Sequence, residues 1–418
     1  MNIEQLYSLY RETFLVDTDT RTIRKGSVFF ALKGDNFNGN KFAEEALKKG
    51  ASYAVVDEEE YKTSDTVFVV DNVLTMLQQL ANYHRNQLKI PIIGLTGSNG
   101  KTTTKELINT VLSKKYRTVA TKGNLNNHIG VPLTLLSMDE DTEIGIVEMG
   151  ANHHKEIALL SSIAEPNYGY ITNFGKAHLE GFGSVEGVIE AKSELYDYLI
   201  ENNKTIFVNP TDEIQLSKTK NGKKVLFDES IKFKEINPFV KVVFDDITIQ
   251  SNLIGTYNFN NIATAITIGK YFNVPKQLIK DAIEEYIPSN NRSQIIKKGT
   301  NKVILDAYNA NPTSMKAALD NFDVLNSLNK VVVLGDMFEL GENSKAEHQL
   351  LANVVEKMGF QKSILVGNHF YQTKTSCLKF KGFEELKEYL KLNIFENNSI
   401  LIKGSRGMAL ERVLDFID

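Results

Sequence analysis

The segment Gly97–Thr103, whose sequence is Gly-Ser-Asn-Gly-Lys-Thr-Thr, constrains the fold more than any other part of the chain. The apolar run Ile90–Leu95 comes just before it and predicts a buried strand, and the residues from Lys101 to Leu112 predict a helix. A glycine-rich turn between a strand and a helix is typical of a phosphate-binding loop, because its N–H groups and the positive end of the helix point at one anion. We therefore expect a parallel α/β sheet with an anion site where this strand ends.

The residues of this loop have predicted roles in binding a nucleoside triphosphate. Lys101 can reach the β- and γ-phosphates, and Thr102 can bind Mg²⁺ through its hydroxyl. The glycines stand at Gly94 and Gly97 instead of at the usual spacing, so the loop is a variant. An incidental glycine-rich turn with a surface lysine is the alternative, but it does not account for the strand, the loop and the helix together. The residues predicted to contact the nucleotide here are Gly97, Ser98, Asn99, Gly100, Lys101, Thr102 and Thr103.

The pattern of apolar runs changes twice along the chain, which predicts three α/β domains. Residues 1–85 predict a small α/β domain, residues 86–291 a parallel-sheet domain with the phosphate loop, and residues 292–418 a Rossmann-like, doubly wound domain. The segment Pro288–Asn291 is the best candidate for a linker between the last two domains. The lysine-rich, alternating segment Thr219–Leu253 predicts a small antiparallel insertion.

The expected elements follow from apolar runs and from helical periodicity. Strands are expected over residues 27–32, 53–56, 67–70, 90–95, 144–148, 168–172, 205–208, 303–306, 331–334, 363–366 and 400–403. Helices are expected over residues 41–49, 73–87, 101–112, 258–272, 276–286, 314–325, 345–357, 384–390 and 408–417.

Composition argues against several classes of protein. The net charge is -4, from 48 basic and 52 acidic residues, which lacks the basic excess of a nucleic-acid binder. The single cysteine, Cys377, can form no internal disulfide, and Glu4, Arg11 and Glu12 interrupt the apolar run that a signal peptide needs. No stretch approaches the roughly 20 apolar residues of a membrane helix. We expect a cytoplasmic monomer that binds neither nucleic acid nor membranes.

Motifs after the phosphate loop carry a resemblance that spans nearly the whole chain. They include Gly123–Pro132 (GNLNNHIGVP), Val147–Asn152 (VEMGAN), Ala177–Gly183 (AHLEGFG), Leu305–Pro312 (LDAYNANP) and Lys403–Arg406 (KGSR). With these motifs the chain resembles the Mur ligases. The form of the motifs is closest to the member that adds D-alanyl-D-alanine to a UDP-linked muramoyl tripeptide.

The resemblance implies an ATP-dependent ligase that joins a carboxylate to an amine through an acyl-phosphate. Amide formation fails at neutral pH because oxide is a poor leaving group, and phosphorylation by ATP supplies a better one. The protein then mainly positions the reactants and neutralises their charge, for which two Mg²⁺ ions are expected. The resemblance also implies a first domain for the UDP-linked substrate, a second for ATP and a third for the incoming dipeptide.

Several residue roles are implied in the same way. Glu148 follows a buried strand, so that its carboxylate can bind Mg²⁺. The resemblance implies that His178 binds a second metal ion and that Lys192, carbamylated by carbon dioxide, also binds metal. It implies that Arg292 approaches the γ-phosphate, although a plain linker arginine fits the sequence equally well. Lys101, Lys192, His178 and Arg292 are thus the expected catalytic residues. Asn258 and Asn261 are expected at the adenine, and Asp306 and Tyr308 are expected at the nucleotide from the last domain.

The substrate-binding residues are expected in loops of all three domains. They are Asp19, Thr20, Arg21, Lys33, Gly34, Asn126, Asn127, Asn309, Asn311, Asp336, Glu339, Ser405 and Arg406. Three alternatives stay open. A sibling ligase that adds a single amino acid typically carries an Asp-Asn-Pro-Arg motif, which this sequence lacks. A folylpolyglutamate-type ligase shares the core of the fold, and a non-catalytic nucleotide switch would share the phosphate loop.

Overall fold

The computed structural model describes residues 1–288, 291–327 and 329–417. The chain divides into two compact units. The first unit comprises Met1–Thr96, Leu112–Ile171 and Ala191–Leu226, and the second comprises Gly97–Val111, Thr172–Glu190 and Phe227–Asp418. The predicted linker Pro288–Asn291 includes positions 289–290, which lie outside the described residues.

The first unit contains two parallel sheets. One has the order β1-β2-β5-β6, from β1 (Val16–Asp17), β2 (Val28–Phe30), β5 (Tyr53–Val56) and β6 (Val67–Val69). The other has the order β12-β11-β10-β7-β9-β8, from β7 (Ile92–Thr96), β8 (Thr118–Ala120), β9 (Ile144–Glu148), β10 (Tyr168–Ile171), β11 (Thr205–Val208) and β12 (Lys223–Leu226). Strands β7, β9 and β11 are buried at every residue, as expected of central strands in a parallel sheet. A short hairpin joins β3 (Lys33–Gly34) to β4 (Phe37–Asn38).

Helices connect these strands. They are α1 (Ile3–Tyr10), α2 (Ala43–Lys48), α3 (Val73–Leu88), α5 (Gly130–Leu135), α6 (Glu156–Ala164) and α9 (Glu213–Lys218), with short 3-10 turns η1 (Thr20–Thr22), η2 (Gly39–Phe42) and η3 (Glu59–Tyr61). Helix α3 begins at the cap Asn72, whose side chain accepts from the Thr75 N–H, and it packs against α1, α5 and α6. It therefore connects the N-terminal sheet to the layer that carries β7.

The second unit contains a small antiparallel sheet and a larger mixed sheet. The small sheet consists of β13 (Ile231–Ile236), β14 (Phe239–Phe244) and β15 (Ile247–Ile254), and α10 (Asn258–Tyr271) and α11 (Lys276–Glu285) pack against it. The larger sheet has the order β16-β17-β21-β18-β19-β20, from β16 (Gln294–Lys298), β17 (Asn301–Asp306), β18 (Lys330–Gly335), β19 (Lys362–Val366), β20 (Leu378–Phe380) and β21 (Ser399–Lys403). Only β16 pairs antiparallel among these described strands.

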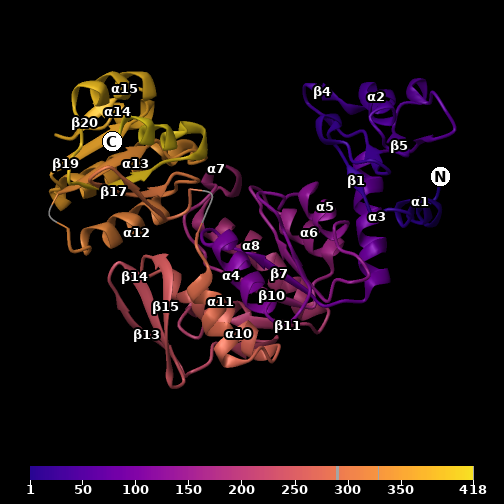
Figure 1. Ribbon diagram of the computed structural model, residues 1–418, viewed down its shortest axis with the longest axis horizontal. Coiled ribbons are helices and arrows are strands. Elements are labelled where there is room, and N and C mark those ends of the chain that lie inside the picture. Colours follow the sequence, from indigo (N-terminus) through magenta and orange to yellow (C-terminus); the bar gives the residue numbers. More distant parts are fainter. Residues whose placement is uncertain (289–290, 328, 418) are drawn as a thin grey trace. The chain divides into compact units, whose positions relative to one another are not determined.

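Helices of the C-terminal region pack on this sheet (Figure 1). They are α12 (Pro312–Asp323), α13 (Ser344–Met358), α14 (Asn368–Tyr371) and α15 (Phe383–Leu392), with the 3-10 turns η4 (Gly341–Asn343), η5 (Arg406–Met408) and η6 (Leu410–Phe416). The apolar core between the sheet and α15 includes Val333, Ile364, Leu386 and Ile402, which are fully buried. Helix α7 (Leu179–Phe182) also belongs to this unit, whereas α4 (Lys101–Leu112) and α8 (Val185–Glu201) each extend from one unit into the other.

The α/β architecture predicted from the sequence is confirmed, and two local predictions are wrong. The segment Thr219–Leu253 is not one antiparallel insertion, because β12 pairs parallel with β11 and only β13 to β15 form the small sheet. The helix predicted over residues 408–417 is instead a pair of 3-10 turns. They are separated by Ala409, whose φ of 47° lies in the left-handed region that interrupts a right-handed helix.

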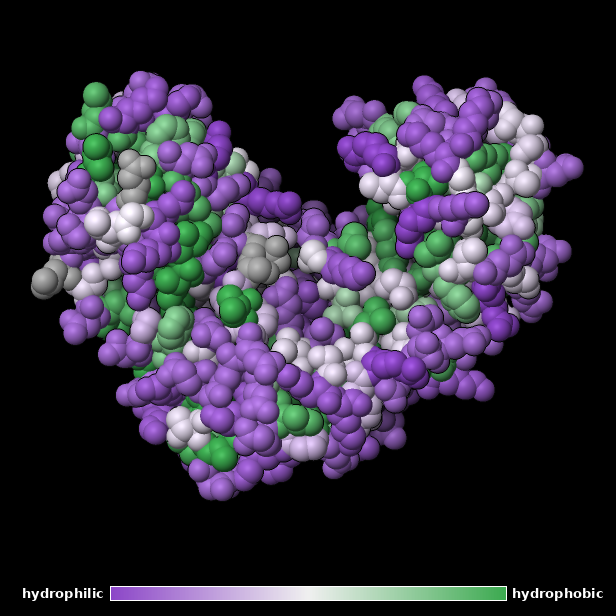
Figure 2. Space-filling model, viewed as in Figure 1, coloured by the Kyte–Doolittle hydropathy of each residue, from purple (hydrophilic) through white to green (hydrophobic). Residues whose placement is uncertain are grey.

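The surface in Figure 2 is mostly hydrophilic, with scattered hydrophobic residues. None of the helices in the described part of the chain combines the length and the apolar character that a membrane span requires.

Candidate active site

The phosphate loop leaves β7 at Thr96 and is fixed by the segment that follows β10. Ser98 N–H donates to the Asn173 carbonyl at 3.1 Å, and the Ser98 hydroxyl donates to the Gly175 carbonyl at 2.9 Å. At Gly97 the φ is +140°, and an added Cβ would stand 2.0 Å from the Thr172 hydroxyl, so only glycine fits. The Lys101 ammonium donates to the Gly97 carbonyl at 2.7 Å, which holds it over the loop.

Asn99 ties this loop to the C-terminal region. Its N–H donates to the Asn173 side chain at 3.1 Å, and its side-chain oxygen accepts from Asn311 Nδ2 at 2.8 Å. Asn311 is also the N-cap of α12, where its oxygen accepts from the Ser314 N–H at 2.9 Å. Both polar ends of the Asn311 amide are therefore engaged, and this predicted substrate-binding residue connects α12 to the phosphate loop.

The two asparagines predicted at the adenine form a buried chain of hydrogen bonds beside the loop. Asn261 Nδ2 donates to Asn258 Oδ1 at 2.7 Å, and Asn258 Nδ2 donates to the Ile254 carbonyl at 2.7 Å. The Thr104 hydroxyl donates to Asn261 Oδ1 at 3.0 Å, which links α10 to α4. This network sets the position of the loop's Gly100, where an added Cβ would lie 3.0 Å from Asn261 Oδ1.

His178 has a carboxylate partner that the sequence did not indicate. Its Nδ1 lies 2.5 Å from Glu339 Oε2, and the Glu180 N–H donates to the Glu339 carbonyl at 3.2 Å. The His178 imidazole beside it lowers the pKa of the Glu339 carboxyl below its ordinary value. Both residues have a positive φ, 52° and 61°, so their side chains are presented from unusual backbone positions. A predicted metal ligand and a predicted substrate-binding residue are thus in direct contact.

Arg292, Tyr308 and Arg406 meet in one stack. The guanidinium carbon of Arg292 lies 3.7 Å from the centre of the Tyr308 ring, and that of Arg406 lies 5.3 Å from the same centre. Both distances are within the range of cation–π attraction. Within the described part of the chain neither arginine forms an ion pair, and the buried Arg292 Nε has no hydrogen-bond partner. The stack therefore offers positive charge to an anion.

Asp306 is held by a lysine that was not among the predicted site residues. Lys403, at the end of β21, is 3% exposed at its side chain and donates to Asp306 Oδ2 at 2.6 Å. It also donates to the Asn309 carbonyl at 3.0 Å, while the other oxygen of Asp306 accepts from the Ser293 N–H at 3.0 Å. The parallel pairing of β17 with β21 brings these two strand ends together. Asp306 therefore keeps one fixed orientation.

Asp336 and Ser405 anchor the loops that follow β18 and β21. The Asp336 carboxylate accepts from the N–H groups of His369 and Phe370 at 3.0 and 2.9 Å. The Ser405 hydroxyl accepts from the Phe338 N–H at 2.9 Å, and the Ser405 N–H donates to the Asp336 carbonyl at 3.2 Å. Both side chains are almost fully buried, so the structure places them under the loop surface on which Arg406 and the exposed Asn309 stand.

The first unit holds the other predicted ligands of metal and substrate. Glu148 is 2% exposed, and its Oε1 accepts from Asn126 Nδ2 at 2.9 Å, so a predicted metal ligand and a predicted substrate-binding residue meet here too. The side-chain oxygen of the neighbouring Asn127 accepts from the N–H of Gly130, the first residue of α5, at 2.9 Å. Lys192 is 1% exposed and donates to the Ala151 carbonyl at 3.1 Å. It is a buried lysine, not a solvated one.

The predicted cations of the N-terminal region are already paired. Arg21 binds the Asp19 carboxylate through its Nε at 2.9 Å, and Lys33 lies 2.8 Å from Asp57 and 2.6 Å from Glu58. Hydrogen bonds from Arg21 lower the pKa of Asp19 to about 2. Thr20 and Gly34 lie beside these residues in η1 and β3. The charges of Arg21 and Lys33 are therefore already compensated by neighbouring carboxylates.

Comparison with known proteins places this geometry in a family. The model of the Mur ligase family, catalytic domain, matches residues 14–85, that of the Mur ligase middle domain residues 95–269, and that of the Mur ligase, glutamate ligase domain, residues 291–406. A UDP-N-acetylmuramoyl-tripeptide–D-alanyl-D-alanine ligase of Bacillus subtilis (strain 168) is 35% identical over 97% of this chain and 93% of its own length. The chain belongs to the Mur ligase family.

Solved structures agree with this assignment. MurF from Acinetobacter baumannii matches this Mur ligase with a TM-score of 0.86 at 30% identity, over 96% of this chain and 92% of the other. MurF ligase from Thermotoga maritima, in complex with ADP, matches with a TM-score of 0.84 at 27% identity, over 96% of both chains. The family resemblance predicted from the motifs is confirmed.

Some residues of the Mur ligase site were missed by the sequence analysis. Lys403 stands in the quoted KGSR motif, and Asn173 comes two residues after the end of β10, so their places at strand ends were the available signal. Thr104 had no such signal, because its partner Asn261 is distant in sequence. These residues hold the predicted ones in place.

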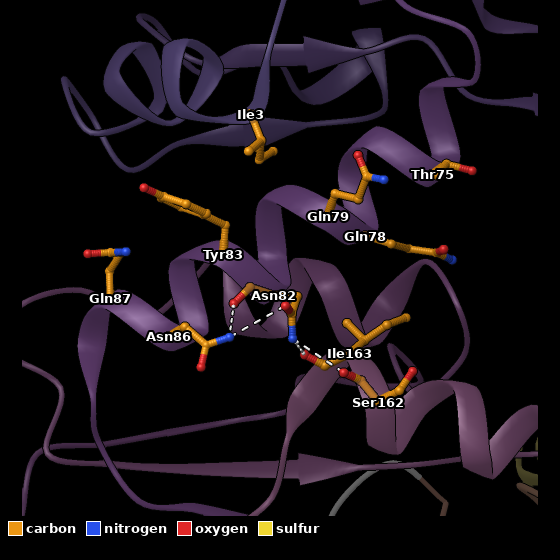
Figure 3. Close-up of a pocket in the computed structure, with 10 residues that line it drawn as sticks. All are labelled: Ile3, Thr75, Gln78, Gln79, Asn82, Tyr83, Asn86, Gln87, Ser162 and Ile163. Carbon is orange, nitrogen blue, oxygen red and sulfur yellow. Dashed lines mark hydrogen bonds between the residues drawn. The ribbon is translucent and has the colours of Figure 1, made fainter.

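A separate groove in the first unit of the Mur ligase contains none of the predicted site residues (Figure 3). It lies along α3 and is lined by uncharged side chains, namely Ile3, Thr75, Gln78, Gln79, Asn82, Tyr83, Asn86, Gln87, Ser162 and Ile163. Asn82 and Asn86 there hydrogen-bond to each other and to neighbouring groups. A groove without a lining cation is poorly suited to a phosphate.

Proposed function

We propose that this Mur ligase is an ATP-dependent ligase that adds D-alanyl-D-alanine to UDP-N-acetylmuramoyl-tripeptide, a step in making cell-wall precursor. The observation that carries the proposal is the full-length match to ligases of that name, at 35% identity for the Bacillus subtilis protein. The phosphate loop, with Lys101 held over it, supports the use of ATP, as does the similar structure that contains ADP. We infer that the protein works in the cytoplasm as a monomer.

The reaction needs two bond exchanges. A carboxylate oxygen of the tripeptide attacks the γ-phosphorus of ATP, the bond from that phosphorus to the bridging oxygen breaks, and ADP leaves. The amine of the dipeptide then attacks the acyl carbon, loses one proton, and inorganic phosphate leaves. Lys101 and Arg292 neutralise charge on the phosphates, and the loop N–H groups bind them.

Magnesium fits the oxygen donors present in this chain. In the first unit the buried carboxylate of Glu148, which accepts from Asn126, is a hard ligand of the kind Mg²⁺ prefers. In the second unit the hydroxyl of Thr102 is a ligand of the same kind. When bound, the ion would polarise phosphoryl oxygens and neutralise charge. We assign His178 and Lys192 as further metal-binding residues on the family resemblance. Before it could bind metal through Nδ1, His178 would exchange its Glu339 partner.

Carbamylation of Lys192 is proposed for the same reason. The amine is buried and held by the Ala151 carbonyl, so a carbamate formed on it would keep a defined position. Intact-protein mass measurement in bicarbonate buffer, with Lys192→Met as the comparison, tests this modification. A mass above that expected from the sequence, in the parent chain and not in Lys192→Met, supports carbamylation. A parent mass equal to that expected from its sequence contradicts it.

The nucleotide is proposed to lie between the phosphate loop and the Asp306 loop. Asp306 and Tyr308 would contact the ribose and phosphates, and the Asn258–Asn261 network would border the adenine. A small cavity beside Asp306, lined by Tyr257 and Ile254 among others, supplies an apolar surface nearby. The dipeptide is assigned to Asn309, Asn311, Asp336, Glu339, Ser405 and Arg406. The UDP-linked substrate is assigned to Asp19, Thr20, Arg21, Lys33, Gly34, Asn126 and Asn127.

An ADP-release assay with mass detection of the product tests the function. We expect ADP release to require both the UDP-linked tripeptide and D-alanyl-D-alanine, with the pentapeptide as product. Release with neither substrate would favour a nucleotide switch. A product that contains a single added amino acid would favour a sibling ligase, and glutamate added to a folate would favour a folylpolyglutamate-type enzyme.

A further inference from the structure

The Tyr308 ring brings together two arginines that the sequence analysis assigned to different substrates. Arg292 lies 3.7 Å and Arg406 5.3 Å from the ring centre, measured from each guanidinium carbon. Arg292 is half-buried, whereas Arg406 is exposed to solvent. The exposed guanidinium is therefore the one that an incoming small molecule can reach first.

Hydrogen bonds hold the backbone turn that carries Arg406. The Ser405 hydroxyl accepts from the Phe338 N–H at 2.9 Å, and the Met408 N–H donates to the Ser405 carbonyl at 2.9 Å. The Ser405 N–H donates to the Asp336 carbonyl at 3.2 Å, and the Asp336 side chain is itself bound to the start of α14. Arg406 thus projects from a fixed turn, which reduces the entropy lost when its guanidinium binds a ligand.

The arginines elsewhere in the described residues are already occupied. They donate to carboxylates or carbonyls: Arg11 to Glu140, Arg21 to Asp19, Arg24 to Asp17, Arg85 to Ala164, Arg117 to Asp141 and Arg412 to Ala409. Arg292 and Arg406 differ from these because, within residues 1–288, 291–327 and 329–417, an aromatic ring is the partner that the structure gives them. Ring stacking leaves the edge donors of a guanidinium available to an anion.

We propose that Arg406 binds the free carboxylate of the incoming dipeptide, and that Tyr308 positions it for this. The inference rests on the proposed function. In the dipeptide the amine must stay free to attack, so the terminal carboxylate is the charged group that the protein can hold. A guanidinium matches a carboxylate with two parallel hydrogen bonds. Arg406 is therefore a specificity-determining residue that selects amines carrying a carboxylate at the far end.

The test compares D-alanyl-D-alanine with its C-terminal amide as the amine substrate, in the parent chain and in Arg406→Gln. A charge-assisted contact predicts that the parent chain prefers the acid in kcat/KM by about tenfold to a hundredfold. Arg406→Gln is expected to lose most of that factor with the acid, mainly through KM, and to be unchanged with the amide. The preference therefore collapses in the variant.

The matched control is Arg412→Gln. Arg412 also stacks on a ring, with its guanidinium carbon 3.9 Å from the centre of the Phe383 ring, and it lies in the same C-terminal segment. It is expected to keep the full preference for the acid. Arg406→Lys keeps the charge without the planar fork, so an intermediate preference is expected.

Each outcome separates the inference from the proposed function. If the parent chain makes product equally well from acid and amide, or if Arg406→Gln keeps the preference, the inference is wrong while the ligase activity stands. If the parent chain makes no product from the dipeptide, the proposed function itself fails. A thermal unfolding transition like that of the parent shows that Arg406→Gln is folded, and if it does not fold, the intermediate preference of Arg406→Lys decides.

Discussion

The predicted anion-binding cations have different partners in the N-terminal and C-terminal regions. In the N-terminal region, Arg21 and Lys33 are paired with carboxylates, so an incoming phosphate would have to compete with Asp19, Asp57 or Glu58. In the C-terminal region, Arg292 and Arg406 are stacked on Tyr308 and form no ion pair among the described residues. A cation without a carboxylate partner can bind an incoming anion at a lower free-energy cost, because no ion pair has to be broken first. The family resemblance predicts a ligand contact for each of these four residues, and the structure shows that their present partners differ.

The largest effect is expected at the phosphate loop. Lys101→Ala removes an ammonium held over the loop by the Gly97 carbonyl, and kcat should fall by a factor on the order of 10²–10³, as for the loss of one transition-state donor. Steady-state ADP release measures this. The exposed Lys62 serves as the control, and Lys62→Ala should keep parent activity. Parent-like turnover in Lys101→Ala would remove the basis of the proposed reaction.

The next effect concerns stability. Lys403→Met leaves the Asp306 carboxylate without its buried partner, and breaking such a pair should lower the free energy of unfolding by about 3 kcal/mol. Urea unfolding measures it. The double variant Lys403→Met with Asp306→Asn should recover part of the loss, because the uncompensated charge is then gone. An equal free energy of unfolding in the parent and in Lys403→Met would show that the Asp306–Lys403 ion pair does not stabilise the fold.

A smaller effect is expected for the half-buried arginine of the stack. Arg292→Gln should lower kcat/KM for ATP by about tenfold, because a charged hydrogen-bond donor near the phosphates is lost while the uncharged side chain still fills the space. The same measurement on Arg85→Gln is the control, since Arg85 donates to the carbonyls of Ala164 and Glu165 and to Asn167. If both variants have the parent value for ATP, the linker-arginine interpretation of Arg292 gains support.

How far the sequence could predict these features depends on whether the relevant signal is local. The phosphate loop is a local pattern of strand, glycines and helix, and α4 begins at Lys101 and ends at Leu112 as predicted. The Asp306–Lys403 pair is not local, because it requires the pairing of β17 with β21 across the sheet. Similarly, the sequence analysis assigned β12 to an insertion, because its lysine-rich composition gives no indication that it pairs with β11. Local motifs thus predict candidate site residues, whereas the residues that hold them in place depend on long-range strand pairing.

The smallest effect is expected for Arg21→Gln, which tests the paired side of the comparison. Asp19 already occupies the Arg21 guanidinium, so KM for the UDP-linked substrate should rise by less than about twofold. The hydrogen bonds from Arg21 lower the pKa of Asp19 to about 2, below the ordinary value of an aspartate. The stability from a lowered pKa is fully present above the higher value and is lost as the pH falls through the lower one. The pair should therefore stay charged across neutral pH, and the profile of KM against pH should be the same in parent and variant there. A large rise in KM for Arg21→Gln would show that the substrate displaces Asp19 from Arg21. The two regions would then differ because the N-terminal cations exchange a carboxylate for the substrate, whereas the C-terminal arginines have no carboxylate to exchange.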